Sequence, residues 1–214
     1  VLDAKKVILT LADNTTNTIT DSSRLSTEED YSAAIYSKEN LIINGNGTLN
    51  VNAGYRNGIK STDDCIIVSG TLNITSTEDG IIGKDLCGIV AGDININAGS
   101  DGIKSTYDTD TTKGNVIIEG GNITIKASND GIQAENILVI NDGTINIKTN
   151  NGAADTTQTH IDNMDMGRGG FGFNNNKTTT TTDDTSESRK GIKAGNMLII
   201  NDGDITIDSD DDSV

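Results

Sequence analysis

Residues 79–103 read DGIIGKDLCGIVAGDININAGSDGI, and this stretch decides the fold because it begins and ends on the same tripeptide. The tripeptide or a close relative recurs at Asn57-Gly58-Ile59, Asp79-Gly80-Ile81, Asp101-Gly102-Ile103, Asp130-Gly131-Ile132 and Lys190-Gly191-Ile192. Gly58, Gly80 and Gly102 are spaced by 22 residues. Gly131 follows Gly102 by 29 residues, which is 22 plus a seven-residue insertion around 108–114. A fixed spacing of this length indicates a structural repeat.

Each repeat also carries two segments of alternating apolar residues on either side of a turn that contains glycine. The first segments hold Leu41 and Ile43, Ile66 and Val68, Gly88 and Val90, Val116 and Ile118, Leu138 and Ile140, and Leu198 and Ile200. The second segments hold Leu49 and Val51, Leu72 and Ile74, Ile94 and Ile96, Ile123 and Ile125, Ile145 and Ile147, and Ile205 and Ile207. A period of 2 predicts strands with one buried face, and Ile and Val are typical strand residues.

With the Gly-Ile segment, each repeat supplies three short strands in about 22 residues, which is one triangular coil. The sequence therefore predicts an all-β fold, a right-handed single-stranded parallel β-helix, with residues 1–214 forming a single domain. Residues 1–38 are expected to form an irregular N-terminal coil that caps the stack. Residues 153–189 are low in complexity and are expected to form a long loop, either disordered or a lid. An antiparallel β-sandwich is the alternative, but it does not require a constant register.

The composition agrees with a thin core and excludes several partners. Hydrophobic residues make up 33% of the chain, Trp and Pro are absent, and six residues are aromatic, so the core must be stacked Ile, Val and Leu. The net charge of −16 argues against nucleic acid and anionic membranes, and no apolar run is long enough to span a bilayer. We expect a monomer. Because the chain lacks an initiator Met and stops in mid-coil, we also expect a trimmed form with further coils beyond its end.

Acidic side chains form two columns if the register is right. Asp79, Asp101 and Asp130 precede Gly-Ile; Asp63, Asp64, Asp85, Asp108 and Asp110 follow it. Carboxylates one coil apart repel by roughly 3 kcal/mol per pair at an effective dielectric near 20, and lysines in the columns are too few to cancel this. Calcium, which takes oxygen ligands with loose geometry, is the cation expected there. A solvated acidic corner without metal is the alternative.

Polar residues on the outer face of the second segments are candidates for carbohydrate binding. Asn73 and Asn95 belong to a column of Asn and Thr that can hydrogen-bond sugar hydroxyls or can form a purely structural ladder. Lys60, Lys104 and Tyr107 complete the predicted carbohydrate-binding residues. Cys65 and Cys87 are 22 residues apart and should be stacked neighbours on successive coils. Two separate thiols are the favoured arrangement, and a disulfide between the coils is the alternative.

The repeat resembles a family of secreted bacterial carbohydrate-binding β-helix proteins that are structurally akin to pectate lyases. The resemblance covers about residues 39–214 and lies in Gly120-Gly121-Asn122-Ile123-Thr124-Ile125, Ser128-Asn129-Asp130-Gly131-Ile132, Lys190-Gly191-Ile192-Lys193-Ala194 and the Gly/Phe-rich segment near Phe171. It implies calcium sites, binding of cellulose and of acidic sugars such as polygalacturonate, no demonstrated cleavage, and a secreted or cell-surface location. Lys190 stands where the family pattern has Asp, which places the calcium corner of that coil in doubt.

A calcium-dependent lyase acting by β-elimination is the alternative function. It needs a basic side chain that accepts the sugar C5 proton, and Lys60, Lys104, Lys193, Arg56 and Arg189 lie at or near the motif. Neighbouring aspartates favour the protonated lysine and so oppose this role. No coil is expected to place one lysine within a cluster of acidic ligands. Together with the resemblance, the sequence therefore favours a non-catalytic, calcium-dependent binder of plant cell-wall polysaccharides.

Overall fold

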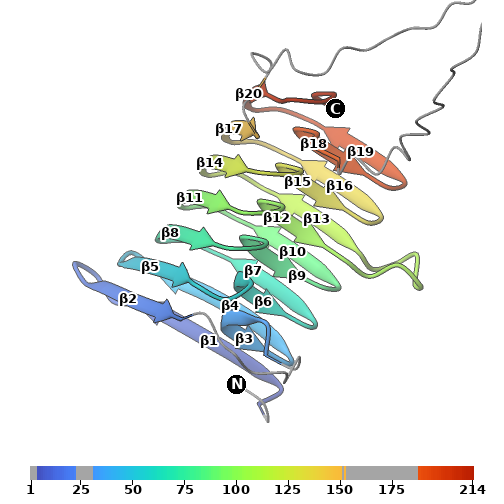
Figure 1. Cartoon of the computed structure of the whole chain (residues 1–214). Helices are drawn as coiled ribbons and strands as arrows, with labels where there is room; N and C mark the ends of the chain where they lie inside the picture. Colours follow the sequence, from blue (N-terminus) through green and yellow to red (C-terminus); the bar gives the residue numbers. More distant parts are fainter. Residues whose placement is uncertain (1–3, 23–30, 151, 153–187) are drawn as a thin grey trace, which may run out of the picture.

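The computed structural model describes residues 4–22, 31–150, 152 and 188–214, and this part of the chain is built from strands and turns without any helix. Twenty strands in these described residues form three sheets, which we name A, B and C (Figure 1). Sheet A contains β1 (Lys6–Leu11), β4 (Asn40–Gly45), β7 (Asp64–Ile67), β10 (Leu86–Ile89), β13 (Asn115–Ile118), β16 (Ile137–Ile140) and β19 (Met197–Ile200). Sheet B contains β2 (Thr16–Asp21), β5 (Thr48–Ala53), β8 (Thr71–Ser76), β11 (Asp93–Ala98), β14 (Asn122–Ala127), β17 (Thr144–Thr149) and β20 (Asp204–Asp208). Sheet C contains β3 (Ala33–Ser37), β6 (Asn57–Ser61), β9 (Ile81–Gly83), β12 (Ile103–Ser105), β15 (Ile132–Ala134) and β18 (Ile192–Ala194).

Neighbouring strands in each sheet come from successive coils and are parallel, as in the pairs β8–β11 and β11–β14. The predicted single-stranded parallel β-helix is therefore confirmed, and the antiparallel sandwich is excluded. The described residues contain no helix that could cross a membrane.

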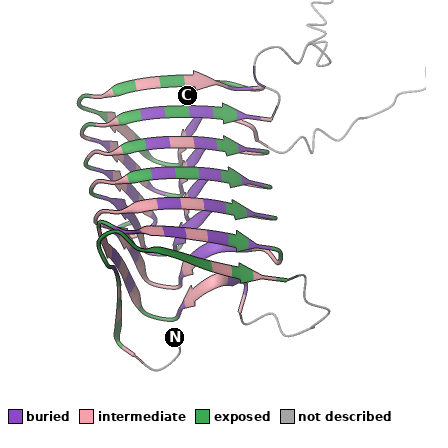
Figure 2. Ribbon diagram, turned by 90° about the vertical axis from the view of Figure 1, so that its left-hand side faces the viewer, coloured by how far each residue is buried: buried purple, intermediate pink, exposed green. Residues whose placement is uncertain are grey.

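The core is a set of vertical ladders of aliphatic side chains. Ile59, Ile81, Ile103 and Ile132 are paired in register along sheet C and are each 0% exposed, as predicted from the 22-residue spacing. Figure 2 shows the alternation of buried and exposed residues along the strands that carry such ladders. Burying one such side chain contributes roughly 1.5–3 kcal/mol, so stacking replaces the bulky core that the composition cannot supply.

The glycine of the Asp-Gly-Ile motif is required by the close approach of successive coils. A Cβ built on Gly80 would lie 2.5 Å from the carbonyl oxygen of Gly102 and 2.5 Å from Cγ2 of Ile96. Both atoms belong to packed neighbours, so a larger residue would push the coils apart.

One part of the predicted pattern is wrong by one residue. In β7 the buried residues are Cys65 and Ile67, instead of the predicted Ile66 and Val68. In β10 the inward side chains are Cys87 and Ile89; Gly88 is also buried but stands in register with Ile66, and Val90 is 44% exposed. These segments are almost continuously apolar, so alternation alone does not say which set faces inward, and a one-residue slip exchanges the two faces. Cys65 and Cys87 are in register, and both are free thiols.

The first coil, the insertion and the long loop compare with the prediction in different ways. The first coil is more regular than expected, because β1, β2 and β3 pair with β4, β5 and β6 like any later coil. The seven-residue insertion lies, as predicted, between β12 and β13. The loop predicted over residues 153–189 lies outside the described residues except for Ser188 and Arg189.

Candidate functional site

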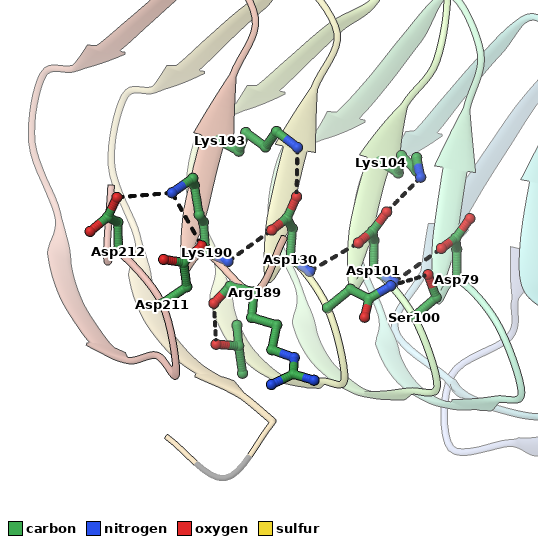
Figure 3. A network of polar contacts seen from close by, with 12 residues as sticks. Asp79, Ser100, Asp101, Lys104, Asp130, Arg189, Lys190, Lys193, Asp211 and Asp212 are labelled. Carbon is green, nitrogen blue, oxygen red and sulfur yellow. Dashed lines mark hydrogen bonds and ion pairs between the residues drawn. The ribbon is translucent and has the colours of Figure 1, made fainter. Parts of the chain in front are cut away.

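Asp79, Asp101 and Asp130 form a hydrogen-bonded ladder at the corner between sheets B and C (Figure 3). Each carboxylate accepts the backbone N–H of the next member, from Asp101 to Asp79 at 3.0 Å and from Asp130 to Asp101 at 2.9 Å. Lys190 continues the ladder by donating its N–H to Asp130 at 2.8 Å. The sequence pattern placed these three aspartates in one column correctly, and their first role there is to bind backbone N–H groups at the corner.

Lysines neutralise two of these carboxylates. Lys104 donates to Asp101 at 2.5 Å, and the Lys193 ammonium lies 3.3 Å from Asp130 (Figure 3). The side chains of Asp101 and Asp130 are only 5% and 2% exposed. The premise that lysines in this column are too few to offset the repulsion is therefore wrong for Asp101 and Asp130. Calcium at this column stays a prediction, but its electrostatic motive is largely removed.

The lysines stand in a line on the outer face of sheet C, on every second coil. Lys60, Ile82, Lys104, Gln133 and Lys193 occupy equivalent positions on successive strands. With about 4.8 Å between strands, the lysines are about 10 Å apart along the solenoid. We call this set the sheet C lysine line.

The pKa values of two of these lysines are shifted in opposite directions. Burial lowers the pKa of Lys60 more than the nearby charge of Asp79 raises it, and its ammonium donates to the Ser32 hydroxyl at 3.1 Å. Burial acts on Lys104 in the same direction, but the hydrogen bond that Lys104 donates to Asp101 and the charges of the surrounding aspartates outweigh burial and raise the pKa of Lys104. Aspartates thus favour the charged form of both lysines, as predicted, but at Lys60 burial outweighs them and the net shift of the pKa is downward.

One cluster of three carboxylates in the described residues could hold a metal ion, because its ligand atoms lie within 4.8 Å of one another. It consists of Asp63, Asp64 and Asp85. It lies at the corner between sheets C and A, as β6 ends at Ser61 and β7 begins at Asp64. Burial raises the pKa of Asp63 and of Asp64, and the proximity of Asp85 raises both further. We call this group the acidic cluster.

Lys113 from the seven-residue insertion reaches the acidic cluster and binds Asp85 at 2.5 Å. This hydrogen bond raises the pKa of Lys113, which therefore stays charged. The expectation that no lysine stands within a cluster of acidic ligands is wrong here. Sequence analysis missed Lys113 because only the folded insertion brings it back to Asp85, 28 residues earlier.

The structure separates Asp108 and Asp110 from the acidic cluster, with which the sequence had grouped them. They line a hollow of about 240 Å³ beside Tyr107, Glu135 and Asn136. Asp110 accepts hydrogen bonds from the Thr112 backbone and hydroxyl, which closes the insertion locally. The ring of Tyr107, a predicted sugar-binding residue, is contacted by the Lys84 and Lys113 ammonium groups at 4.9 and 4.8 Å from its centroid.

Asn73 and Asn95 lie on the outer face of sheet B, around the corner from the sheet C lysine line. They line a groove of about 280 Å³ together with Asn97, Thr124 and Lys126. Asn95 donates to Asn73 at 3.1 Å, and Asn73 donates to Asn50 at 2.9 Å, so the structural ladder considered for this column exists. The five predicted carbohydrate-binding residues are therefore divided among sheet B, sheet C and the insertion.

Comparisons with known proteins agree with this architecture. The chain is 36% identical over 78 residues to a carbohydrate-binding domain-containing protein of Acetivibrio thermocellus, a match that covers 35% of this chain and 27% of that relative. A solved structure described as the polysaccharide lyase-like protein from C. thermocellum, in a gadolinium derivative, superposes with a TM-score of 0.71 at 27% identity, over 95% of this chain and 69% of that one. The model of the carbohydrate-binding domain-containing proteins matches residues 1–214. The chain therefore belongs to the family of carbohydrate-binding domain-containing proteins.

Proposed function

We propose that the protein is a non-catalytic, calcium-dependent binder of plant cell-wall polysaccharides, with acidic polymers such as polygalacturonate and also cellulose as ligands. It acts as a monomer outside the cell, where these polymers are found.

The sheet C lysine line is the single observation that carries the proposal. Its ammonium groups recur about every 10 Å along the axis, so an acidic polymer lying along the solenoid meets a cation at regular intervals. The Lys104 and Lys193 side chains are 24% and 38% exposed, and each ammonium has three donors. A ligand carboxylate can therefore be added to the existing pair with Asp101 or Asp130 without displacing it.

The charge of the two partners supports the proposed calcium dependence. A protein with a net charge of −16 repels an anionic polymer at long range, and a bound divalent cation reduces that repulsion. The acidic cluster fits calcium chemically, because Asp63, Asp64 and Asp85 offer only oxygen ligands from three closely spaced carboxylates. Bound calcium would supply positive charge at this corner and could bridge a uronate carboxylate to the protein.

The first experiment measures retention of the protein in gels that contain polygalacturonate, with calcium or with a chelator. We expect retention with calcium and its loss with chelator. Lys60→Gln should weaken retention several-fold, whereas Lys6→Gln, an equal change of charge on the exposed start of β1, should not. Retention unaffected by both the chelator and Lys60→Gln would contradict the proposal.

Lyase activity is the second candidate, favoured by Lys60 alone. A proton acceptor needs a depressed pKa, and burial lowers the pKa of Lys60. The deciding assay follows the ultraviolet absorbance of unsaturated products released from polygalacturonate with calcium. Binding without product supports the non-catalytic function. Product formation that Lys60→Ala abolishes and Lys6→Ala preserves would replace it with β-elimination.

A further inference from the structure

The outer face of sheet B holds two adjoining hollows that together form one long groove. The first, of about 280 Å³, lies over β8, β11 and β14, and the second, of about 270 Å³, continues toward Lys148 and Asn150. Asn97 and Lys126 line both hollows, so they mark the middle of the groove. In Figure 2 the strands of this sheet face the viewer, with exposed residues alternating along them. We call these two hollows the sheet B groove.

Lys126 is an exposed ammonium whose charge no carboxylate offsets within the described part of the chain. It stands in register with Asn97 on one side and Lys148 on the other. Lys148 pairs with Asp208 at 2.9 Å, which leaves Lys126 beside a neutral amide and a lysine that is already neutralised. In a protein of net charge −16, such a position is an isolated site of positive potential.

The groups around Lys126 leave hydrogen-bonding capacity for a ligand. The amide ladder of sheet B ends at Asn95, which donates to Asn73 and is followed in the next coil by Thr124 rather than by another asparagine. The Asn97 side chain is exposed and makes no hydrogen bond to another described residue. Amides and hydroxyls on either side of one cation are suited to a sugar chain that carries a carboxylate among its hydroxyls.

We propose that the sheet B groove is a second polysaccharide-binding site, in which Lys126 binds the carboxylate of one uronate unit and Asn95 and Asn97 bind hydroxyls of the adjacent units. The inference rests on the proposed function for the identity of the ligand, an acidic polysaccharide. The location of the site is independent of that proposal, because the groove lies on sheet B and the lysine line lies on sheet C. Two sites on two sheets let one molecule hold two polymer chains. The protein would then cross-link acidic polysaccharide chains as well as bind them.

The test compares Lys126→Gln with Lys6→Gln in gels that contain polygalacturonate or fully methyl-esterified pectin, both with calcium. Lys126→Gln should weaken binding to polygalacturonate about tenfold, equivalent to about 1.4 kcal/mol, and should leave binding to the esterified polymer unchanged. Combining Lys126→Gln with Lys60→Gln should multiply the two single effects, as expected for independent sites. Turbidity from chain cross-linking should fall with Lys126→Gln even at protein concentrations that saturate the polymer.

The outcomes separate the two proposals. If Lys126→Gln behaves like Lys6→Gln in the gels and in the turbidity assay, the second site is refuted while calcium-dependent retention still supports the proposed function. If Lys60→Gln and the chelator have no effect but Lys126→Gln weakens binding, the sheet B groove holds the polymer and the sheet C lysine line does not. If wild-type protein is not retained by either polymer, both proposals fail. Side-chain amide signals of Asn95 and Asn97 in NMR spectra should shift on titration with digalacturonate, and unchanged signals would also refute the site.

Discussion

Replacing Asp101 by alanine should destabilise the protein by the same amount with and without calcium. The Asp101 carboxylate is already hydrogen-bonded by the Asp130 backbone N–H and by the Lys104 ammonium. Alanine leaves the buried N–H of Asp130 without its acceptor, at a cost of about 1–3 kcal/mol. It also removes the charged hydrogen bond from Lys104, worth about 1.5–3 kcal/mol. Burial raises the pKa of Asp101 despite the opposing lysine. Removing the carboxylate therefore also removes the cost of burying its charge, which offsets part of the lost stability. We therefore expect a net loss of about 3 kcal/mol.

Asp101→Asn is the matched variant, because its side-chain oxygen still accepts the Asp130 N–H while the charge is lost. It should cost about half as much as the alanine variant. For a chain of this size, 3 kcal/mol corresponds to a fall in Tm of about 6–12 °C. The assay is thermal unfolding followed by circular dichroism, in calcium and in chelator.

Two results would refute this reasoning. A Tm of Asp101→Ala within 2 °C or so of the wild type would mean that the ladder contributes little, given the conversion above. A loss that appears only in calcium would mean that Asp101 is a metal ligand, as the sequence first suggested.

Three further predictions follow from the core and the acidic cluster. Ile103→Ala should cost about 2–5 kcal/mol in urea denaturation, because its side chain is fully buried in the sheet C ladder; a loss under 1 kcal/mol would place it outside a packed core. Burial raises the pKa of Asp63 and Asp64 above 3.8, so in chelator the folded state holds protons more tightly than the unfolded chain, and Tm should fall as pH rises above that value. Asp63→Asn with Asp64→Asn should flatten this fall and abolish the upward shift of Tm by calcium; an unchanged calcium shift would exclude the acidic cluster as its site. Burial raises the pKa of Cys65 strongly and that of Cys87 to about 12, so both thiols should react with a disulfide reagent only after unfolding, and fast labelling of the native protein would contradict their burial.

The sequence predicted the ladders most securely where apolar residues alternate with polar ones along a strand. Ile94 and Ile96 alternate with asparagines, so only one face can be apolar, and the structure buries both. The run Cys65-Ile66-Ile67-Val68 has no such alternation, and its register was assigned one residue too late. In that run the inward face is chosen by packing against neighbouring coils, which local sequence does not encode.

For the candidate sites, the sequence likewise predicted some features, and others became visible only in the tertiary structure. Spacing alone placed Asp79, Asp101 and Asp130 in one column, because identical positions of a 22-residue coil must stack. It did not reveal that Lys193 neutralises Asp130, a partner 63 residues earlier, or that an insertion brings Lys113 to Asp85. Nor did it distinguish Lys126 from the other outward lysines, since an ammonium counts as unpaired only when every neighbouring coil is known. The sequence by itself determined the fold and the columns, because both follow from a repeat. Only the tertiary structure decided which charges are compensated, because flexible side chains select their partners across coils in three dimensions.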